Sequence, residues 1–307
     1  MLGAIARRLA ASAATLIAVI ILAGLLIHIV PGDPVTAMMA QSVTATPEVM
    51  AEMRRHLGLD LPVWQQVGLY LFHVVQGDLG LTIRGNEPVL TLLIQRLPNT
   101  FMLAVSGLGV ALAIGLPLGF VAALNRNGLG DSVVMLIAVL GVSIPSFWLG
   151  LVLLQVFSLD LGWLPVAGSG WRNMILPALT LGVTYSALVA RMTRSTVIEI
   201  LGEDYVRTAR ARGLREWQVL SIHVLRPALI NIVTVVGLVF AYLMGGQVII
   251  ENVFSWNGIG RLAIQAMLQR DYPLIQGFII VFASSVVLVS VVLDILYRIL
   301  DPRLSRP

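Results

Sequence analysis

The chain offers few residues for catalysis. Its twenty basic residues are all arginine, and it contains no cysteine. A P-loop needs the lysine of GxxxxGK(S/T) to contact nucleotide phosphates, and a pyridoxal phosphate enzyme needs a lysine for its Schiff base. The lack of cysteine excludes disulfides, thiolate metal sites and cysteine nucleophiles. If nucleotide hydrolysis drives this protein, another subunit must perform it.

One short motif carries a catalytic alternative. Residues 128–131, Gly-Leu-Gly-Asp, fit GxGD, which is typical of intramembrane aspartyl proteases. Such an enzyme needs a second aspartate facing the first inside the membrane, and the sequence shows no second mid-span aspartate. We therefore interpret Asp131 as the N-cap of the helix that follows. The histidines are scattered without an HExxH motif, so no metal site is predicted: they are His28, His56, His73 and His223.

The most charged stretch, here called the basic loop, runs from Glu203 to Pro227 and contains five arginines. It opens on two acidic residues, which favour a helix N-terminus. Gly213 stands where that helix would end in the left-handed conformation. A second amphipathic piece, Leu214–Leu225, leads to a proline that suits the first turn of another helix. Such a surface could dock in a partner's groove or lie on anionic lipid, and the pattern alone favours neither.

The remaining sequence predicts an all-α integral membrane protein. Of its 307 residues, 58% are hydrophobic and 12% charged, with a mean hydropathy of +0.91, whereas soluble domains are about 25% charged. A spanning helix needs about 20 apolar residues. Six segments qualify: 9–30, 100–124, 132–158, 174–190, 228–250 and 274–297. Pro117 and Pro145 are expected to kink the second and third spans, and the fourth is expected to start irregularly near Pro177.

The arginines predict the orientation. Thirteen fall on the side that holds both termini and the basic loop, and seven on the other. Because cytoplasmic loops carry the excess of basic residues, we expect both termini to be cytoplasmic, in a bacterial plasma (inner) membrane. Trp163, Trp171 and Trp256 are expected at the membrane interface.

The spans also predict the organisation of the chain. Residues 1–30 form an N-terminal arm with the first span, and residues 31–98 form an extracytoplasmic segment. An amphipathic stretch around Pro47–Leu57 indicates a small ordered cap there, with an irregular loop as the alternative. Residues 99–300 form a five-helix core that includes a cytoplasmic loop at 193–227, and residues 301–307 form a cytoplasmic tail.

The basic loop resembles the EAA loop of ABC-importer permeases, whose general form is EAA-x3-G-x9-I-x-L-P. Aligned on Gly213, only Ala209, Gly213 and Leu225 match, and the proline comes one residue late at Pro227. The local form DYVRTARARG is closer to the variant of the dipeptide/oligopeptide permease branch, (D/E)Y(V/I)RTARAKG, from which it departs at Arg212 with the charge kept.

Further segments resemble the same branch, in the same order along nearly the whole chain. They are VPGDP at 30–34, LGLDLPVWQQ at 57–66, GDLGLTIR at 77–84, SIPSFWLG at 143–150, LGWLPVAG at 161–168, ILPALTLG at 175–182, ENVFSWNGIGRL at 251–262 and RDYPLIQG at 270–277. An outer segment of 60–70 residues after the first span is typical of the "B" permease of the heterodimeric pair.

The resemblance implies a type I ABC-importer permease fold and a non-catalytic subunit. Its implied partners are a second permease, two ATP-binding cassette subunits that bind ATP and magnesium, and an extracytoplasmic substrate-binding protein. No cofactor in this chain and no nucleic-acid partner are implied. Cargo in the branch includes dipeptides, oligopeptides, glutathione and nickel chelates, which the sequence does not separate.

The resemblance also implies which residues couple the chain to the ATPase. Arginines 207, 210 and 212 would make charge contacts, Tyr205 would be an apolar anchor and Gly213 the turn. The full implied set is Asp204, Tyr205, Arg207, Thr208, Ala209, Arg210, Arg212 and Gly213.

No substrate path is evident from the sequence. The polar residues in or beside spans are Asn99, Gln155, Asn231, Gln247 and Asp294. We interpret Asp294 as paired with Arg298 near a helix end, and Asn231 and Gln247 as bonded to neighbouring helices. An ion-driven secondary transporter is the alternative class. It would predict inverted repeats and acidic or broken helices at mid-membrane, and neither is evident in the sequence.

Overall fold

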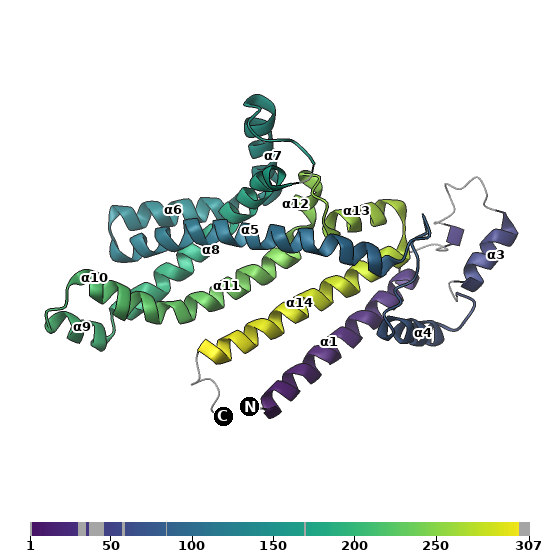
Figure 1. Ribbon diagram of the computed structural model, residues 1–307, viewed down its shortest axis with the longest axis horizontal. Helices are drawn as coiled ribbons and strands as arrows, with labels where there is room; N and C mark the ends of the chain where they lie inside the picture. Colours follow the sequence, from purple (N-terminus) through teal and green to yellow (C-terminus); the bar gives the residue numbers. More distant parts are fainter. Residues whose placement is uncertain are drawn as a thin grey trace. The chain divides into compact units, whose positions relative to one another are not determined.

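The computed structural model describes residues 2–29, 35–36, 46–56, 59–83, 85–168 and 170–300. Within these residues the chain is almost entirely helical (Figure 1), and the extended segments contribute one isolated bridge, between Leu81 and Pro88. The chain divides into two compact units, one of residues 1–98 with 258–291 and one of residues 99–257 with 292–307.

The described helices follow one another along the chain. Their bounds are α1 (Leu2–Ile29), α3 (Pro47–His56), α4 (Val63–Val75), α5 (Val89–Leu124), α6 (Leu129–Ser143), α7 (Ser146–Leu154), the π-helix η1 (Gln155–Asp160), α8 (Trp171–Leu201), α9 (Asp204–Ala211), α10 (Glu216–Gln218), the π-helix η2 (Val219–Leu225), α11 (Arg226–Gly246), α12 (Val248–Val253), α13 (Ile259–Gln269) and α14 (Tyr272–Leu300).

Four of the described helices are long and apolar enough to cross a membrane. They are Arg7–His28 of α1, all of α5, all of α8, and Tyr272–Leu293 of α14. Two bent pairs, Leu129–Gly141 with Ser146–Asp160 and Glu216–Leu229 with Asn231–Gly245, bring the number to six if each pair is one span. The predicted all-α membrane fold is therefore confirmed.

Two predicted spans have different bounds in the structure. Helix α5 begins at Val89 rather than near residue 100. Helix α8 begins at Trp171, so Pro177 lies inside it rather than at an irregular start. It also continues to Leu201, because buried side chains recur there at helical spacing, at Thr193, Val197 and Ile200. The predicted cytoplasmic segment 193–227 therefore starts within α8, and the residues after this helix begin at 202.

The third span is broken where a kink was predicted. Helix α6 ends at Ser143, Ile144 is extended (φ −82°, ψ 121°), and α7 starts directly after Pro145, at an angle of 92° to α6. A residue before proline is forced towards extended conformations, and proline itself cannot donate a helical hydrogen bond. Pro117, in contrast, lies within α5 without interrupting it.

Close contact of α5 with α8 forms the frame of the second unit. A Cβ on Gly115 of α5 would lie 2.6 Å from Val189 Cβ and 2.7 Å from the Ser186 carbonyl oxygen on α8. Gly119 similarly meets the backbone of Ala190. Small residues allow such backbone approach between membrane helices. Helix α8 also packs against α6, α7 and α11.

The first unit joins α1 to α4 and to the start of α14. Helix α4 packs on α1, and Gln276 of α14 donates from Nε2 to the Ala23 carbonyl oxygen of α1 at 2.9 Å. Asp271 accepts from the Ile83 backbone N–H at 3.0 Å. Helix α3 forms in the predicted amphipathic stretch, of which Leu57 lies outside the described residues, while α4 was not predicted.

Gly115→Ala is expected to destabilise the second unit by about 1–3 kcal/mol, because the added methyl group would overlap α8. Gly109→Ala is a matched control on the same helix, since a Cβ there meets nothing within 4 Å. The midpoint temperature of the detergent-solubilised protein, followed by size-exclusion chromatography after heating, should fall only for the first variant. Equal midpoints would contradict the tight α5–α8 contact.

Candidate functional site

The basic loop folds as the sequence predicts. Helix α9 begins after Glu203, whose carbonyl oxygen accepts from the backbone N–H groups of Val206 and Arg207. The helix ends at Ala211, and Gly213 adopts a left-handed conformation (φ +76°). A glycine adopts this conformation without the steric penalty of a side chain. Helix α10 and the π-helix η2 then lead into α11, with Pro227 in its first turn, as predicted.

One face of α9 is buried against the ends of the membrane helices. Val206 and Ala209 belong to a cluster of buried apolar residues that also draws on α5, α8, η2 and α11: Ala123, Val197, Ile200, Val219, Val224, Ala228 and Ile232. Complete burial of a valine side chain contributes about 1.5–3 kcal/mol. Apolar contact thus holds α9 to the membrane helices, and α9 lies with α10 at one end of the second unit (Figure 1).

The opposite face of α9 is exposed. The Arg207 side chain is 72% exposed and lies 3.6 Å from an Asp204 carboxylate oxygen, and the Tyr205 residue is 44% exposed. Seven of the eight residues implied by the resemblance are exposed: Asp204, Tyr205, Arg207, Thr208, Arg210, Arg212 and Gly213. The eighth, Ala209, is buried in the apolar cluster and supports the helix from beneath.

Arg210 binds within the loop. Its guanidinium donates to both carboxylate oxygens of Glu216, at 2.6 and 3.2 Å. A bidentate pair of this kind is stronger and more directional than a single neutral hydrogen bond. The pair joins the end of α9 to the start of α10 across Gly213, so Arg210 shapes the loop in addition to presenting charge.

A second charged contact links α6 to α8 and corrects an expectation. The N-cap of α6 is Gly128, and Asp131 lies in the first turn. Its carboxylate accepts from Arg194 at 2.5 and 2.6 Å and from the Asn127 backbone N–H at 2.9 Å. The sequence shows opposite charges near the ends of neighbouring spans. That Asp131 and Arg194 form an ion pair depends on the packing of α6 against α8.

Asn99, one of the polar residues in or beside spans, bonds the segment that precedes α13. Asn99 donates to the Asn257 carbonyl oxygen at 2.8 Å, and its own carbonyl accepts from Trp256 Nε1 at 3.0 Å. Trp256 is therefore buried and is not the interfacial residue expected. The buried carboxylate of Glu251, which sequence reasoning missed, accepts from Thr100 at 2.6 Å.

The predicted bonds of two of these polar residues are not found. Gln247 is buried between α11 and α12, and neither amide atom meets a hydrogen-bond partner among the described residues. Asn231 is exposed on α11. Gln247 lies at the break between α11 and α12, and the Asn231 side chain is exposed. Neither residue therefore makes the expected bond to a neighbouring helix that the structure describes. Gln155 bonds Asp160 at 2.8 Å, and the side chains of Asp294 and Arg298 lie outside the described part of the chain.

The fold and the loop define a multi-pass membrane protein whose helices present a small charged helix at one end. Residues 115–306 match the family described as the binding-protein-dependent transport system inner membrane component, and residues 1–104 match the corresponding N-terminal family. Among the described residues, no group of three metal-ligating side chains gathers in one place.

Curated relatives match along the whole chain. The chain is 41% identical over 303 residues to the glutathione transport system permease protein GsiC of Salmonella choleraesuis (strain SC-B67), and 42% identical to GsiC of Escherichia coli O6:H1. Each match covers 98% of both chains.

Solved structures show the same fold. The MetNI methionine ABC transporter, in inward-facing conformations, is similar with a TM-score of 0.55 at 20% identity, covering 68% of this chain and 96% of that one. An amino acid ABC transporter with histidines gives 0.56 at 17% identity, covering 68% and 94%.

The chain belongs to the family of binding-protein-dependent transport system inner membrane components. It is a permease of an ABC importer, of the dipeptide/oligopeptide type, in the inner membrane. This membership confirms the predicted resemblance and decides against the aspartyl protease and the ion-driven transporter.

Removing one member of the Asp131–Arg194 pair is expected to lower the thermal midpoint, because the other charge then loses its bidentate partner; their side chains are 6% and 26% exposed. The losses of Asp131→Ala and Arg194→Ala should not add in the double variant. The thermal midpoint in detergent checks this, with Arg191→Ala, an exposed arginine on the same helix, as control. Additive losses would show that the two side chains act independently.

Proposed function

We propose that the basic loop couples this permease to an ATP-binding cassette subunit, through the exposed face of α9. The observation that carries the proposal is the division of α9 into two faces. Val206 and Ala209 fix the helix to the ends of the membrane helices, while Tyr205, Arg207 and Arg212 remain available to a partner. An amphipathic helix of this kind fits a groove on another protein.

The attachment of α9 supports a mechanical role. Helix α9 shares its buried cluster with α8, η2 and α11, so a displacement of α9 would be carried to these helices. A ligand shifts a two-state equilibrium only by its differential affinity for the two states. ATP binding to the partner subunits would therefore act on the membrane helices through the position of α9.

The proposed assembly follows the family. A second permease would complete the translocation path, two cassette subunits would bind ATP and magnesium beneath the loop, and an extracytoplasmic binding protein would deliver cargo. This chain would be non-catalytic, with both termini and the basic loop in the cytoplasm, as the arginine distribution favours. The naming of its relatives for glutathione transport supports a peptide-like cargo.

Arg207→Glu tests the proposal directly, because an exposed side chain can change charge without disturbing the fold. In the co-purified complex, reconstituted in liposomes, we expect cargo-stimulated ATP hydrolysis to fall about tenfold or the cassette subunits to be lost, since close charge pairs at interfaces contribute about 1.5–7 kcal/mol. The control is Arg172→Glu, which makes the same charge change at the start of α8, the end of that helix far from the basic loop.

Arg210 requires a separate design because it pairs with Glu216. The exchange Arg210→Glu with Glu216→Arg preserves the pair inside the loop while moving the positive charge. If Arg210 only shapes the loop, the exchange restores the activity lost in Arg210→Glu; if a partner contacts Arg210, the exchange stays defective. Full coupled activity of Arg207→Glu would instead identify α9 as a helix that lies on lipid.

A further inference from the structure

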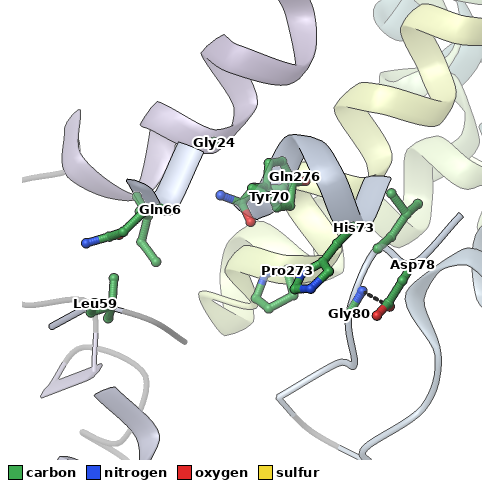
Figure 2. A pocket seen from close by; sticks show the side chains of 11 residues that line it. Gly24, Leu59, Gln66, Tyr70, His73, Asp78, Gly80, Pro273 and Gln276 are labelled. Carbon is green, nitrogen blue, oxygen red and sulfur yellow. Dashed lines mark hydrogen bonds between the residues drawn. The ribbon is translucent and has the colours of Figure 1, made fainter. Parts of the chain in front are cut away.

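A pocket of about 170 Å³ lies within the first unit, away from the basic loop. The end of α1, the residues before α4, α4 itself, the turn that follows it and the start of α14 all contribute to its wall. Figure 2 shows Leu59 and Gln66 on one side of this view, His73, Asp78 and Gly80 on the other, and Tyr70 and Gln276 between them. Its volume suits one functional group with a short stem, because pockets for drug-sized ligands measure about 300–1,000 Å³.

The polar groups that line the pocket include several hydrogen-bond acceptors. Gln276 donates from Nε2 to the Ala23 carbonyl oxygen at 2.9 Å, and Gln66 donates from Nε2 to the Leu61 carbonyl oxygen at 2.7 Å. Each glutamine thus uses one amide N–H in the fold, which leaves its Oε1 and its second N–H available to a ligand. His73 can accept through a ring nitrogen when it is neutral.

Asp78 gives the pocket a negative charge. Its Oδ1 accepts from the Gly80 backbone N–H at 2.9 Å, which fixes the carboxylate in the turn after α4 (Figure 2). The second oxygen remains available to a ligand. Among the described residues that line the pocket, none is an arginine. A carboxylate without a lining cation favours a positively charged group and disfavours an anion.

Tyr70 adds a polar group that the fold leaves without a partner. Its hydroxyl is shielded from solvent and meets no hydrogen-bond partner among the described residues. Burial raises the pKa of this hydroxyl, so it stays protonated and uncharged. A buried polar group without a partner is unfavourable, but this hydroxyl is closed to solvent, so a ligand in the pocket would have to displace its surroundings to reach it. The remaining lining is apolar and includes Ile27, Leu79 and Pro273.

We propose that this pocket binds an aliphatic cation, a primary ammonium or guanidinium group on a short apolar stem. The cation would lie against the Asp78 carboxylate and the glutamine Oε1 atoms, and the stem against the apolar lining. A free amine and a basic side chain of a docked protein share this chemistry. The inference rests on the pocket alone and does not depend on the role of the basic loop.

Because the natural chain contains no cysteine, an introduced one is its sole thiol, and the mass of this chain reports its modification in the intact complex. Leu59→Cys places a thiol in the pocket. Val75→Cys is the control, on an α4 residue that is 77% exposed and outside the pocket lining. The probes are the cationic 2-aminoethyl and the anionic 2-sulfonatoethyl methanethiosulfonates, with the complex in nanodiscs.

We expect the ratio of cationic to anionic labelling rates to be about tenfold higher in the Leu59→Cys variant than in the Val75→Cys variant, as attraction by a nearby carboxylate would give. Adding Asp78→Asn should remove most of this preference while keeping an oxygen that accepts from the Gly80 N–H. Adding Tyr70→Phe leaves the Asp78 charge in place and should therefore keep the preference. An unchanged ratio with Asp78→Asn, or equal ratios in the two cysteine variants, would overturn the proposal.

Protection experiments then identify the source of the cation. n-Butylammonium should slow labelling of the thiol in the Leu59→Cys variant, whereas n-butanol, its neutral counterpart, should not. Protection by the added extracytoplasmic binding protein without any amine would assign the site to a basic side chain of that protein. Protection by the free amine alone would assign it to a solute. Absence of protection in both arms would overturn the proposal.

Discussion

The buried face of α9 is the contact on which the proposed transmission of movement depends. Val206 and Ala209 are short side chains, so α9 lies close to the helices beneath it. Separating them would return apolar surface to water at about 25 cal/mol per Å². A partner that pulls on α9 therefore moves the ends of α8 and α11 before it detaches the helix. The charged face can be adapted to a partner only because the apolar face is already satisfied within the chain.

Contacts elsewhere in the second unit keep its helices in register. Glycines of α5 let its backbone approach α8 closely, and the Asp131–Arg194 pair ties α6 to the same helix. The bonds from Thr100 to Glu251 and from Trp256 to Asn99 connect residues 99 and 100 of α5 to the segment that follows α11. These bonds lie at helix ends, where they fix geometry without exposing charge to lipid.

Local signals in the sequence were sufficient for much of this structure. The hydropathy pattern predicts the membrane helices, and the acidic start, Gly213 and Pro227 predict the form of the basic loop. Tertiary contacts determined the remainder. The extension of α8 to Leu201 depends on side chains that are buried only when the loop packs back on the helix. The pairing of Asp131 and the burial of Trp256 depend on which helices become neighbours, and a single sequence does not contain that information.

The break at Pro145 restricts the surroundings of this part of the chain. A helix that ends and another that starts leave carbonyl and N–H groups without helical partners, and Pro145 is exposed within this unit. Hydrocarbon cannot satisfy such groups, so irregular backbone at membrane depth occurs only beside water or against protein. If residues 143–146 lie below the membrane surface, lipid tails therefore cannot be their neighbours. Where α6 and α7 form one span, their break marks a side of the permease that faces an aqueous space or another subunit.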